Sequence, residues 1–305
     1  MIYTDTHAHL SLAAEELGLP VLLSLLREYE AAWETDGAAL ILDPGVEADD
    51  LPRRRALLGD RPFLRYAAGI WPSEEALSEP AAQLEKLAAV LDADAAACAA
   101  SGPAPGAGTI GGVAAGRGSG AGTIGGVAAI GECGLDYHHM NGLVGAQREL
   151  FVGQIELAER RGLPLVVHSR DAAADTLAVL RECRPRIPVI LHCFGYGPGE
   201  LEDFLALDCY ISFAGNLSYK SARPLREACA LVPRGRLLLE TDAPYMNPEP
   251  RRGRPSTSAD VERTYAVAAA LRSTSVEELA ATVSANARTL FGAGRPAGVG
   301  PASAD

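Results

Sequence analysis

The chain has 305 residues and a hydrophobic fraction of 48%, which is ample for one large buried core. Its formal net charge of −12 argues against a broad electrostatic surface for gripping long nucleic acids, whose affinity comes largely from Lys and Arg on phosphates. The acidic balance does not exclude a nuclease that holds a chain end locally, because bound metal ions supply concentrated positive charge.

Nothing in the sequence indicates a membrane protein or a secreted one. No apolar run reaches the roughly 18 residues that a membrane span needs, and the N-terminus lacks the features of a signal peptide. The six cysteines form no CxxC pair, so we expect buried free thiols in a reducing cytoplasm. We predict a cytoplasmic protein with no membrane association, and no obligate protein partner is evident.

Eight strand-like segments alternate with helix-like stretches along the chain. The strands are expected near residues 1–9, 38–45, 63–71, 127–134, 163–168, 187–193, 208–214 and 236–242. Leucine or alanine at helical spacing predicts helices at Leu19–Glu34, Ala76–Asp94, Arg148–Arg161, Ala172–Cys183, Gly199–Leu207 and Ala222–Leu231. Closing helices are expected at Ala259–Arg272, Ser275–Val283 and Ala285–Phe291. Alternating βα units predict a parallel sheet, and eight of them predict a single-domain (β/α)8 TIM barrel over residues 1–292.

A tandem repeat precedes the strand expected at 127–134. The residues Gly106–Ala115 recur word for word as Gly120–Ala129. The second copy runs into that strand and supplies its start, which leaves the first copy redundant. We therefore expect a disordered Gly-rich insert at about residues 101–122, with a functional lid as the less favoured alternative. The Gly/Ala/Pro-rich tail, residues 293–305, is also expected to be disordered.

The strongest functional signal is a set of polar residues at strand ends. Six residues of metal-ligating type close five of the expected strands: His7, His9, Glu132, His168, His192 and Asp242. One such histidine is more often a packed core residue than a ligand, but six at five strand ends are not a plausible coincidence. Imidazole and carboxylate together suit a divalent metal such as zinc, manganese or iron. A barrel brings these strand ends to one mouth, whereas an open doubly wound sheet would spread them along an edge, so the barrel is favoured.

The spacing of these residues predicts a centre for two cations. Residues two apart in a strand face the same way, so His7 and His9 project together as a clamp on one cation. The two oxygens of Glu132 can reach one metal each, and His168 and His192 would complete the shell of the second metal. Two cations roughly 3.5–4 Å apart stabilise both the attacking and the leaving oxygen of a displacement.

Asp242 is expected to bind the first metal and to take a proton from a metal-bound water. Binding to a metal lowers the pKa of water from 15.7 towards about 7, which generates hydroxide at neutral pH. The reaction class is hydrolysis, with Asp242 and Glu132 as its catalytic carboxylates. Cys133 and Cys193 each follow a proposed ligand, and the alternation of side chains in a strand predicts that their thiols point away from the metal.

Taken in order, these motifs resemble those of the TatD-type metal-dependent hydrolases, often described as deoxyribonucleases, of the amidohydrolase-like superfamily. The resemblance is carried by the segments Asp5–His9, Gly131–Tyr137, Val167–Asp171, Leu191–Phe194, Tyr210–Phe213, Leu239–Tyr245 and Ser284–Arg288. It implies two divalent metal ions on the six ligands above, and hydrolysis of phosphodiesters, often from a DNA 3′ end. Zinc, manganese or magnesium would suit such a site.

Three departures from the family pattern are present, and none of them touches a proposed ligand. Family members usually carry Gly-Ile-His-Pro-His where this chain has Gly69–Ser73, so that Trp71 and Ser73 replace two imidazoles expected beside the substrate. Trp71 is expected either to stack on a base or to pack at the barrel rim. The segment Arg251–Ser256 keeps the arginines of an Arg-Gly-Lys-Arg-Asn-Glu-Pro pattern but lacks its Asn-Glu pair. The third departure is the duplicated insert.

Four residues near the ligands keep two interpretations each. Asp5 faces the right way to orient a ligand histidine, or it satisfies backbone donors. Asp136 lines the mouth and contacts substrate, or it is a turn residue before Tyr137. His138 and His139 are expected as loop residues, with contact to substrate as the less favoured alternative.

The leading prediction is a 3′-exonuclease-type deoxyribonuclease that acts on DNA ends or short oligonucleotides. Arg170, Arg252 and Arg254 are its candidate phosphate contacts, and Trp71 and Asp136 are further candidates for binding substrate. The same mechanism attacks carbonyl groups, so a hydrolase of carboxyl esters, lactones or amides, including aminoacyl-tRNA esters, stays open as an alternative. A non-catalytic scaffold is least favoured, because such proteins normally lose ligands and all six are present here.

Overall fold

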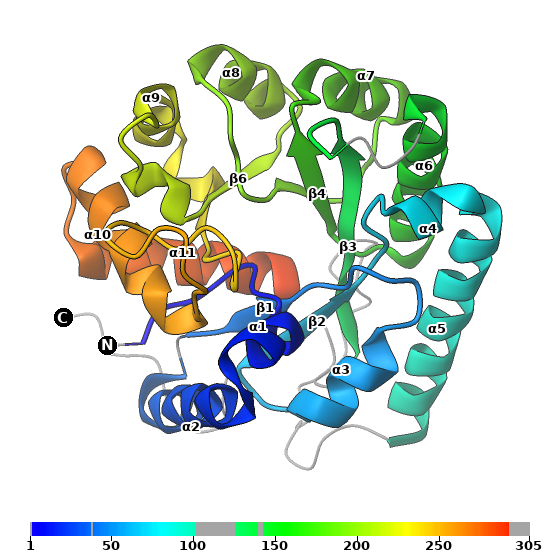
Figure 1. Cartoon of the computed structure of the whole chain (residues 1–305), viewed down its shortest axis with the longest axis horizontal. Helices are drawn as coiled ribbons and strands as arrows, with labels where there is room; N and C mark the ends of the chain where they lie inside the picture. The colour runs from blue at the N-terminus through cyan, green and yellow to red at the C-terminus, as the bar shows by residue number, and fades with distance from the viewer. Residues whose placement is uncertain (1, 38, 102–125, 140–142, 293–305) are drawn as a thin grey trace, which may run out of the picture.

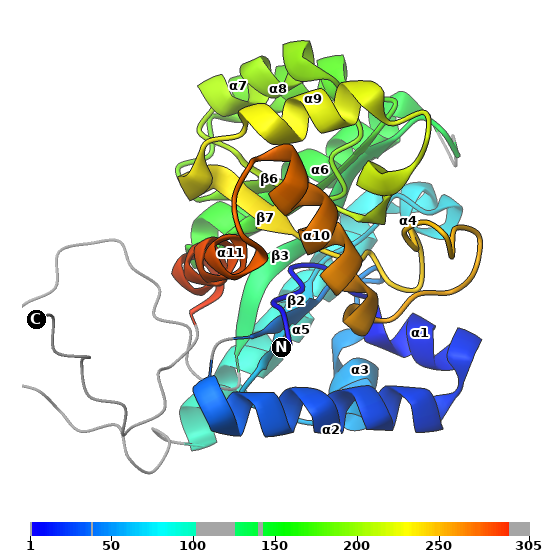
Figure 2. The same ribbon diagram turned by 90° about the vertical axis from the view of Figure 1, so that its left-hand side faces the viewer.

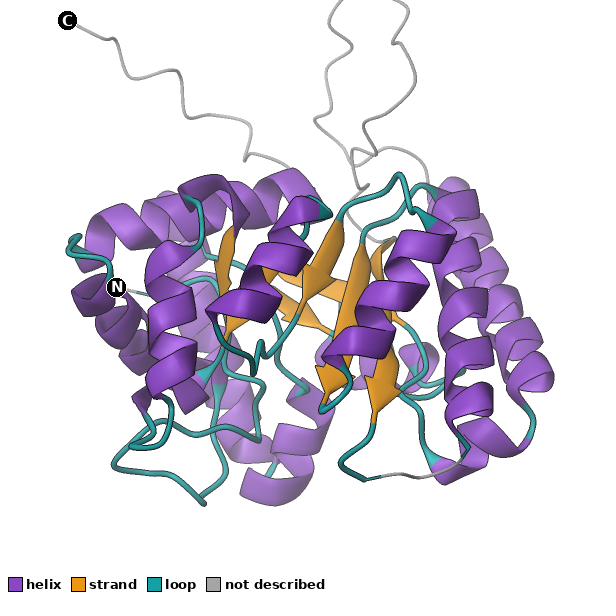
Figure 3. Ribbon diagram, turned by 90° about the horizontal axis from the view of Figure 1, so that it is seen from above, coloured by secondary structure: helices purple, strands orange, loops and turns teal. Residues whose placement is uncertain are grey.

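The computed structural model describes residues 2–37, 39–101, 126–139 and 143–292. The predictions for residues 102–122 of the insert and for the tail 293–305 lie outside these ranges. Seven parallel strands pair strictly in chain order. They are β1 (Ile41–Asp43), β2 (Leu64–Ala68), β3 (Val127–Asp136), β4 (Leu165–Arg170), β5 (Val189–Leu191), β6 (Tyr210–Phe213) and β7 (Leu237–Leu239). Figure 3 shows these strands at the centre of the molecule, with helices around them.

The first segment of the chain closes this sheet into a barrel. Asp5 forms a parallel bridge with Ile41 of β1, and Ala8 forms one with Ala243, which follows β7. Backbone hydrogen bonds from the same segment reach both neighbours. The segment expected as a continuous strand over residues 1–9 forms only two isolated bridges, and it takes the place of the eighth strand between β7 and β1. With this closure, the predicted (β/α)8 barrel is confirmed.

The helices form a ring outside the strands (Figures 1 and 2). They are α1 (Leu10–Leu17), α2 (Leu19–Asp36), α3 (Leu51–Leu58), α4 (Glu74–Ser78), α5 (Pro80–Ser101), α6 (Val144–Arg161), α7 (Ala173–Cys183), α8 (Pro198–Ala206), α9 (Arg223–Leu231), α10 (Val261–Leu271) and α11 (Val276–Phe291). Among the described residues, none of these helices is long and apolar enough to cross a membrane. The predicted helices are present, with differences at three places.

Two of the differences concern where a helix breaks. The helix expected at Ala76–Asp94 is split, because Ser73 caps α4 by accepting from the Ala76 N–H, and Pro80 begins α5 afresh. The two closing helices expected around Ser284 are one continuous helix, α11. Ser284, which lies between the two expected helices, is inside α11, and its buried hydroxyl forms a 2.8 Å hydrogen bond with that of Thr4.

The third difference is the pair α1 and α3, which the apolar spacing did not predict. The sequence of α3 contains three consecutive arginines, a pattern typical of a solvated surface. Arg54 is nevertheless only 2% exposed. Its guanidinium donates to Asp43, Asp50 and the carbonyl of Ala67, so its charge is neutralised and its donors are satisfied within the barrel wall.

A bulge in β3 brings Glu132 to the barrel mouth. The pairing with β4 advances three residues on β3, from Ile130 to Cys133, while it advances two on β4. Gly134 adopts φ 141°, and a Cβ added there would lie 2.0 Å from the carbonyl oxygen of His168. The two strands therefore approach more closely than a side chain at this position would allow, which places Glu132 beside His168.

Candidate metal centre

The six predicted ligands lie together at the carboxyl ends of the barrel strands. His168 lies on β4, Glu132 on β3, His192 directly after β5, and Asp242 three residues beyond β7. His7 and His9 come from the closing segment. Three overlapping sets of side chains each hold their ligand atoms within 4.8 Å of one another: His7, His9 and Asp242; Glu132, His168 and His192; and His7, His192 and Glu240.

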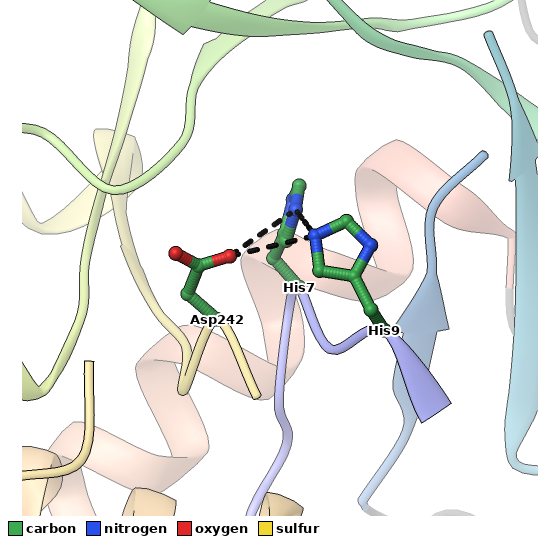
Figure 4. Close-up of side chains that lie close together, drawn as sticks. All are labelled: His7, His9 and Asp242. Atoms are coloured by element: carbon green, nitrogen blue, oxygen red, sulfur yellow. Dashed lines mark hydrogen bonds and ion pairs between the residues drawn. The ribbon is translucent and has the colours of Figure 1, made fainter. Parts of the chain in front are cut away.

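The first half of the centre brings His7 and His9 of the closing segment close to Asp242. The Nε2 atoms of His7 and His9 lie 3.3 Å apart. One oxygen of Asp242 lies 3.8 Å from His7 and 3.5 Å from His9, as the dashed lines in Figure 4 mark. Oε2 of Glu132 lies 2.8 Å from the first imidazole and 3.3 Å from the second. Two imidazoles and two carboxylates therefore face one point.

The second half of the centre is formed by His168 and His192, which face the two oxygens of Glu132. Oε1 of this carboxylate lies 3.7 Å from Nδ1 of His168, and its Oε2 lies 3.7 Å from Nε2 of His192. Those two ring nitrogens are 3.1 Å apart. Glu132 thus stands between both halves, which is the position that a bridging carboxylate requires.

The outward nitrogens of the second pair are occupied by buried carboxylates. Nδ1 of His192 faces Oε1 of Glu240 at 3.3 Å, and Nε2 of His168 faces Oδ2 of Asp136 at 3.0 Å. If each neutral ring donates its N–H to its carboxylate, both inward nitrogens carry lone pairs that face each other. Lone pairs at that separation repel unless a cation lies between them. The donor set of this half therefore fits a divalent metal.

The charges of the cluster also favour a bound cation. Burial lowers the pKa of His9, but the Asp242 and Glu132 carboxylates outweigh burial and raise it to about 10. Burial is likewise outweighed at His192, where Glu132 and Glu240 raise the pKa to about 9. Burial raises the pKa of Glu132 and Asp242, yet the neighbouring imidazoles lower both below their usual range. The site has an excess of carboxylate charge and holds positive charge strongly.

Glu240 is the residue of this site that the sequence analysis missed. It is fully buried, and its Oε1 also accepts the Cys193 N–H at 2.7 Å. Its Oε2 and Nδ1 of His7 are both buried without a hydrogen-bond partner among the described residues. The available signal was a glutamate directly after the apolar strand β7, since a buried carboxylate requires a partner.

The hydrogen bonds of Asp136 and Asp5 distinguish between the two interpretations given for each residue. Asp136 is 1% exposed and accepts from the backbone and ring of His139 as well as from His168, so it is more than a turn residue. Asp5 accepts from the backbone N–H groups of His7 and Thr241 and from the Thr241 hydroxyl. Asp5 therefore satisfies backbone donors and ties the closing segment to the residues that follow β7.

Two cavities adjoin the cluster. The larger, of about 360 Å³, is lined by Trp71, Tyr245, His139 and Arg170 together with ligand residues. The smaller, of about 200 Å³, is lined by Tyr196 and Asn216, again with Arg170 and ligand residues. Arg170 lines both cavities, and its guanidinium makes no ion pair with any residue that the structure describes.

The cysteines beside the ligands behave differently from each other. Sγ of Cys133 lies 3.6 Å from the Val166 carbonyl, buried and directed away from the cluster as expected. Cys193 also supplies no atom to the ligand sets among the described residues, but it lines the smaller cavity. Its φ of 44° breaks the strand alternation on which the expectation rested.

A comparison with known proteins identifies the family of this site. Residues 123–292, more than half of the chain, match the model of the family described as TatD related DNase. The chain belongs to the TatD related DNase family. The matched segment carries Glu132, His168, His192 and Asp242, whereas His7 and His9 lie outside it.

Individual TatD relatives extend this comparison. The chain is 41% identical over 164 residues to the uncharacterized metal-dependent hydrolase YcfH of Escherichia coli K12, covering 53% of this chain and 62% of YcfH. It is 37% identical over 169 residues to the Pantoea vagans protein named 3′-5′ ssDNA/RNA exonuclease TatD, covering 53% of this chain and 65% of that protein. The chain thus spans less than two thirds of these relatives' length.

A structural match covers more of the TatD fold than the sequence matches do. The crystal structure of YJJV, a TatD homologue from Escherichia coli K12, superposes with a TM-score of 0.74 at 26% identity, covering 95% of this chain and 97% of that chain. The closing segment with His7 and His9 belongs to the same barrel as the family segment, because its backbone forms hydrogen bonds with β1 and with β7.

The residues that depart from the TatD pattern occupy different places. Trp71 lines the larger cavity, and its ring packs edge-on against His168 at 6.1 Å. Ser73 is used as a helix cap. Arg252 stacks over the Tyr219 ring at 4.3 Å, and Arg254 is exposed. Neither arginine is among the described residues that line the two cavities, so the structure brings Arg170 and Trp71 to the centre but leaves Arg252 and Arg254 outside it.

Proposed function

We propose that this chain is a divalent-metal-dependent hydrolase that cleaves phosphodiesters at DNA ends or in short oligonucleotides. The observation that carries the proposal is the convergence of six imidazole and carboxylate side chains on a TatD barrel, directly beside Arg170, which forms no ion pair within the described part of the chain. When bound, two divalent cations would polarise the scissile group and supply a nucleophile at neutral pH.

Each carboxylate has a distinct role in this proposal. Asp242 is ionised at neutral pH, because nearby imidazoles lower its pKa, and it accepts the proton of the attacking water. Its backbone φ of 57° is unusual for a residue other than glycine and fixes its carboxylate towards His9. Glu132 holds the two halves of the centre together.

The cavity walls favour a nucleotide over a neutral ester. A phosphodiester carries a negative charge, which the guanidinium of Arg170 at the cavity wall can neutralise by paired hydrogen bonds. Trp71 and Tyr245 give the larger cavity aromatic faces on which a base can stack. The name of the Pantoea vagans relative, a 3′-5′ exonuclease of single-stranded DNA and RNA, fits the same substrate class.

Asp242→Asn tests the catalytic role of the carboxylate. The change keeps the shape of the side chain but removes its basicity, so turnover of labelled single-stranded DNA should fall by about 10² to 10⁴-fold. Circular dichroism should be unchanged, which separates loss of chemistry from loss of fold. Turnover within a few-fold of the parent protein would remove Asp242 from its role as proton acceptor.

Arg170→Ala tests the substrate class. With Mg²⁺, Mn²⁺ or Zn²⁺, the parent protein should shorten 3′-ended single-stranded DNA, and the variant should lose about tenfold or more in kcat/KM, as expected for a charge-assisted hydrogen bond. Arg160→Ala, on the exposed face of α6, is the matched control. The proposed function fails if no metal supports DNA cleavage while carboxyl esters or lactones are hydrolysed at equal rates by the parent protein and by Arg170→Ala.

A further inference from the structure

His139 is held at the edge of the larger cavity by Asp136. One oxygen of this buried carboxylate accepts the His139 backbone N–H at 2.8 Å, and the other faces Nδ1 of the ring at 2.8 Å. The ring also packs edge-on against Trp71, with centroids 5.7 Å apart at 75°. A side chain that is fixed by its backbone, by one ring nitrogen and by an aromatic neighbour is oriented before any ligand arrives.

The remaining ring nitrogen of His139 is unused by the protein. Nε2 makes no hydrogen bond with any part of the chain that the structure describes, and the side chain is 47% exposed. The ring lines the same cavity as Trp71, Glu132 and Asp242. An imidazolium here would give one N–H to Asp136 and present the other to a bound ligand.

A second donor stands close by. Asp136 and Arg170 are register partners on β3 and β4, and the Tyr137 N–H donates to the Arg170 carbonyl at 2.9 Å. Arg170 ends β4, His139 lies in the turn that follows β3, and both line one cavity. Two hydrogen-bond donors beside the candidate metal centre, one of them a guanidinium, match an anion with several acceptor oxygens, and a phosphate is such a group.

We propose that His139, oriented by Asp136, binds a phosphate oxygen of the substrate together with Arg170. This inference rests on the proposed function, because it assigns the phosphate group of that substrate to a particular wall of the cavity. His139 thereby contributes to affinity for the phosphorylated ligand and is not a metal ligand.

The chain offers a matched control in the neighbouring histidine. His138 is similarly exposed, and its ring lies 5.1 Å from that of His139. It faces Asp171 at 3.5 Å and is not among the described residues that line either cavity. His138→Ala removes an equal imidazole from the same loop but none of the side chains that line the larger cavity.

The experiment measures binding of inorganic phosphate to metal-loaded protein by calorimetry, alongside metal content and KM for single-stranded DNA. His139→Ala should weaken phosphate binding about tenfold and raise KM by a similar factor, with metal content unchanged. His138→Ala should stay within twofold of the parent. His139→Arg, which restores donors to the anion, should recover most of the phosphate affinity.

Two results would overturn the proposal. Phosphate affinity in His139→Ala equal to that of His138→Ala would show that His139 does not contact the anion. Loss of metal from His139→Ala would show that the residue acts through Asp136 and His168 instead. Because phosphate binding is measured without turnover, a parent protein that binds phosphate but cuts no DNA would refute the proposed function and leave the test of His139 intact.

Discussion

At the scale of single residues, each imidazole of His168 and His192, the second pair of proposed ligands, has a carboxylate behind it. Glu240 stands behind His192, and Asp136 stands behind His168. Such a carboxylate fixes which ring nitrogen keeps its proton and raises the basicity of the nitrogen that faces the metal. Glu240 is also close to His7, whose ring stacks on His192 with centroids 3.9 Å apart. One buried carboxylate therefore influences two ligands.

Glu240→Gln should weaken metal binding by about 10 to 100-fold, because the amide cannot match the charge that orients His192 and its neighbour. Competition with a chromophoric chelator would measure the affinity, and a chemical denaturation curve would check the fold. Glu202→Gln, an exposed change on α8, serves as the control. Equal metal affinities in the two variants would contradict the role given to Glu240.

At the scale of elements, the contact between β3 and β4 decides the geometry of the centre. Glu132 and His168 approach because β3 bulges and because Gly134 leaves room for the His168 carbonyl. Gly134 also has a positive φ, which a residue with a Cβ adopts at a cost. The element is therefore specified by the absence of a side chain, which no apolar spacing in the sequence can reveal.

Gly134→Ala should destabilise the protein by about 1 to 3 kcal/mol, as overpacked cores do, and should lower metal affinity by displacing His168. Gly145→Ala is the matched control. It also replaces a glycine by alanine, but in helix α6, where an added Cβ has no atom within 4 Å. That control should be neutral or stabilising by up to about 1 kcal/mol. Equal unfolding free energies for both variants would be inconsistent with the close approach of the strands.

At the scale of the whole molecule, closure of the barrel brings distant parts of the chain to one site. His9 and Asp242 are far apart in the sequence, yet Nε2 of His9 lies 3.5 Å from Oδ1 of Asp242. Without a cation, a proton on His9 or His192 offsets the carboxylate charge that closure concentrates. A metal ion bound by the proposed ligands would therefore compete with protons for the same nitrogens.

This competition predicts how metal and pH act together on stability. The folded pKa values of about 10 for His9 and about 9 for His192 lie above the unfolded value of about 6.5. The stability that these protons contribute is complete below about pH 6.5 and is lost as the pH rises through about 9 to 10. A metal ion must displace them, so the rise in Tm on adding Mn²⁺ should be larger near pH 8.5 than near pH 6.

Thermal melts with and without Mn²⁺ at the two pH values measure this difference. The double variant His9→Gln, His192→Gln should show little metal-dependent shift at either pH, because the competing nitrogens are gone. A parent protein whose Tm shift is equal at both pH values, or larger at the lower one, would exclude proton competition at these imidazoles.

The sequence determined the barrel and its six clustered ligand-type residues, because each rests on a local pattern. Apolar runs and helical spacing set the alternation of elements, and a polar residue at the end of a buried strand is visible without coordinates. His7, His9 and Asp242 were placed together on the ground that parallel strands end at one mouth.

Only the tertiary structure decided what surrounds those ligands. The burial of Arg54, the carboxylate of Glu240 behind His192 and the hold of Asp136 on His139 depend on partners far away in the chain. The arginines were alike in sequence, yet the fold carries Arg170 to the cavities and leaves Arg252 stacked on Tyr219. Local pattern fixes the type of an element, whereas the pairing of buried charges is settled only when the barrel closes and excludes water.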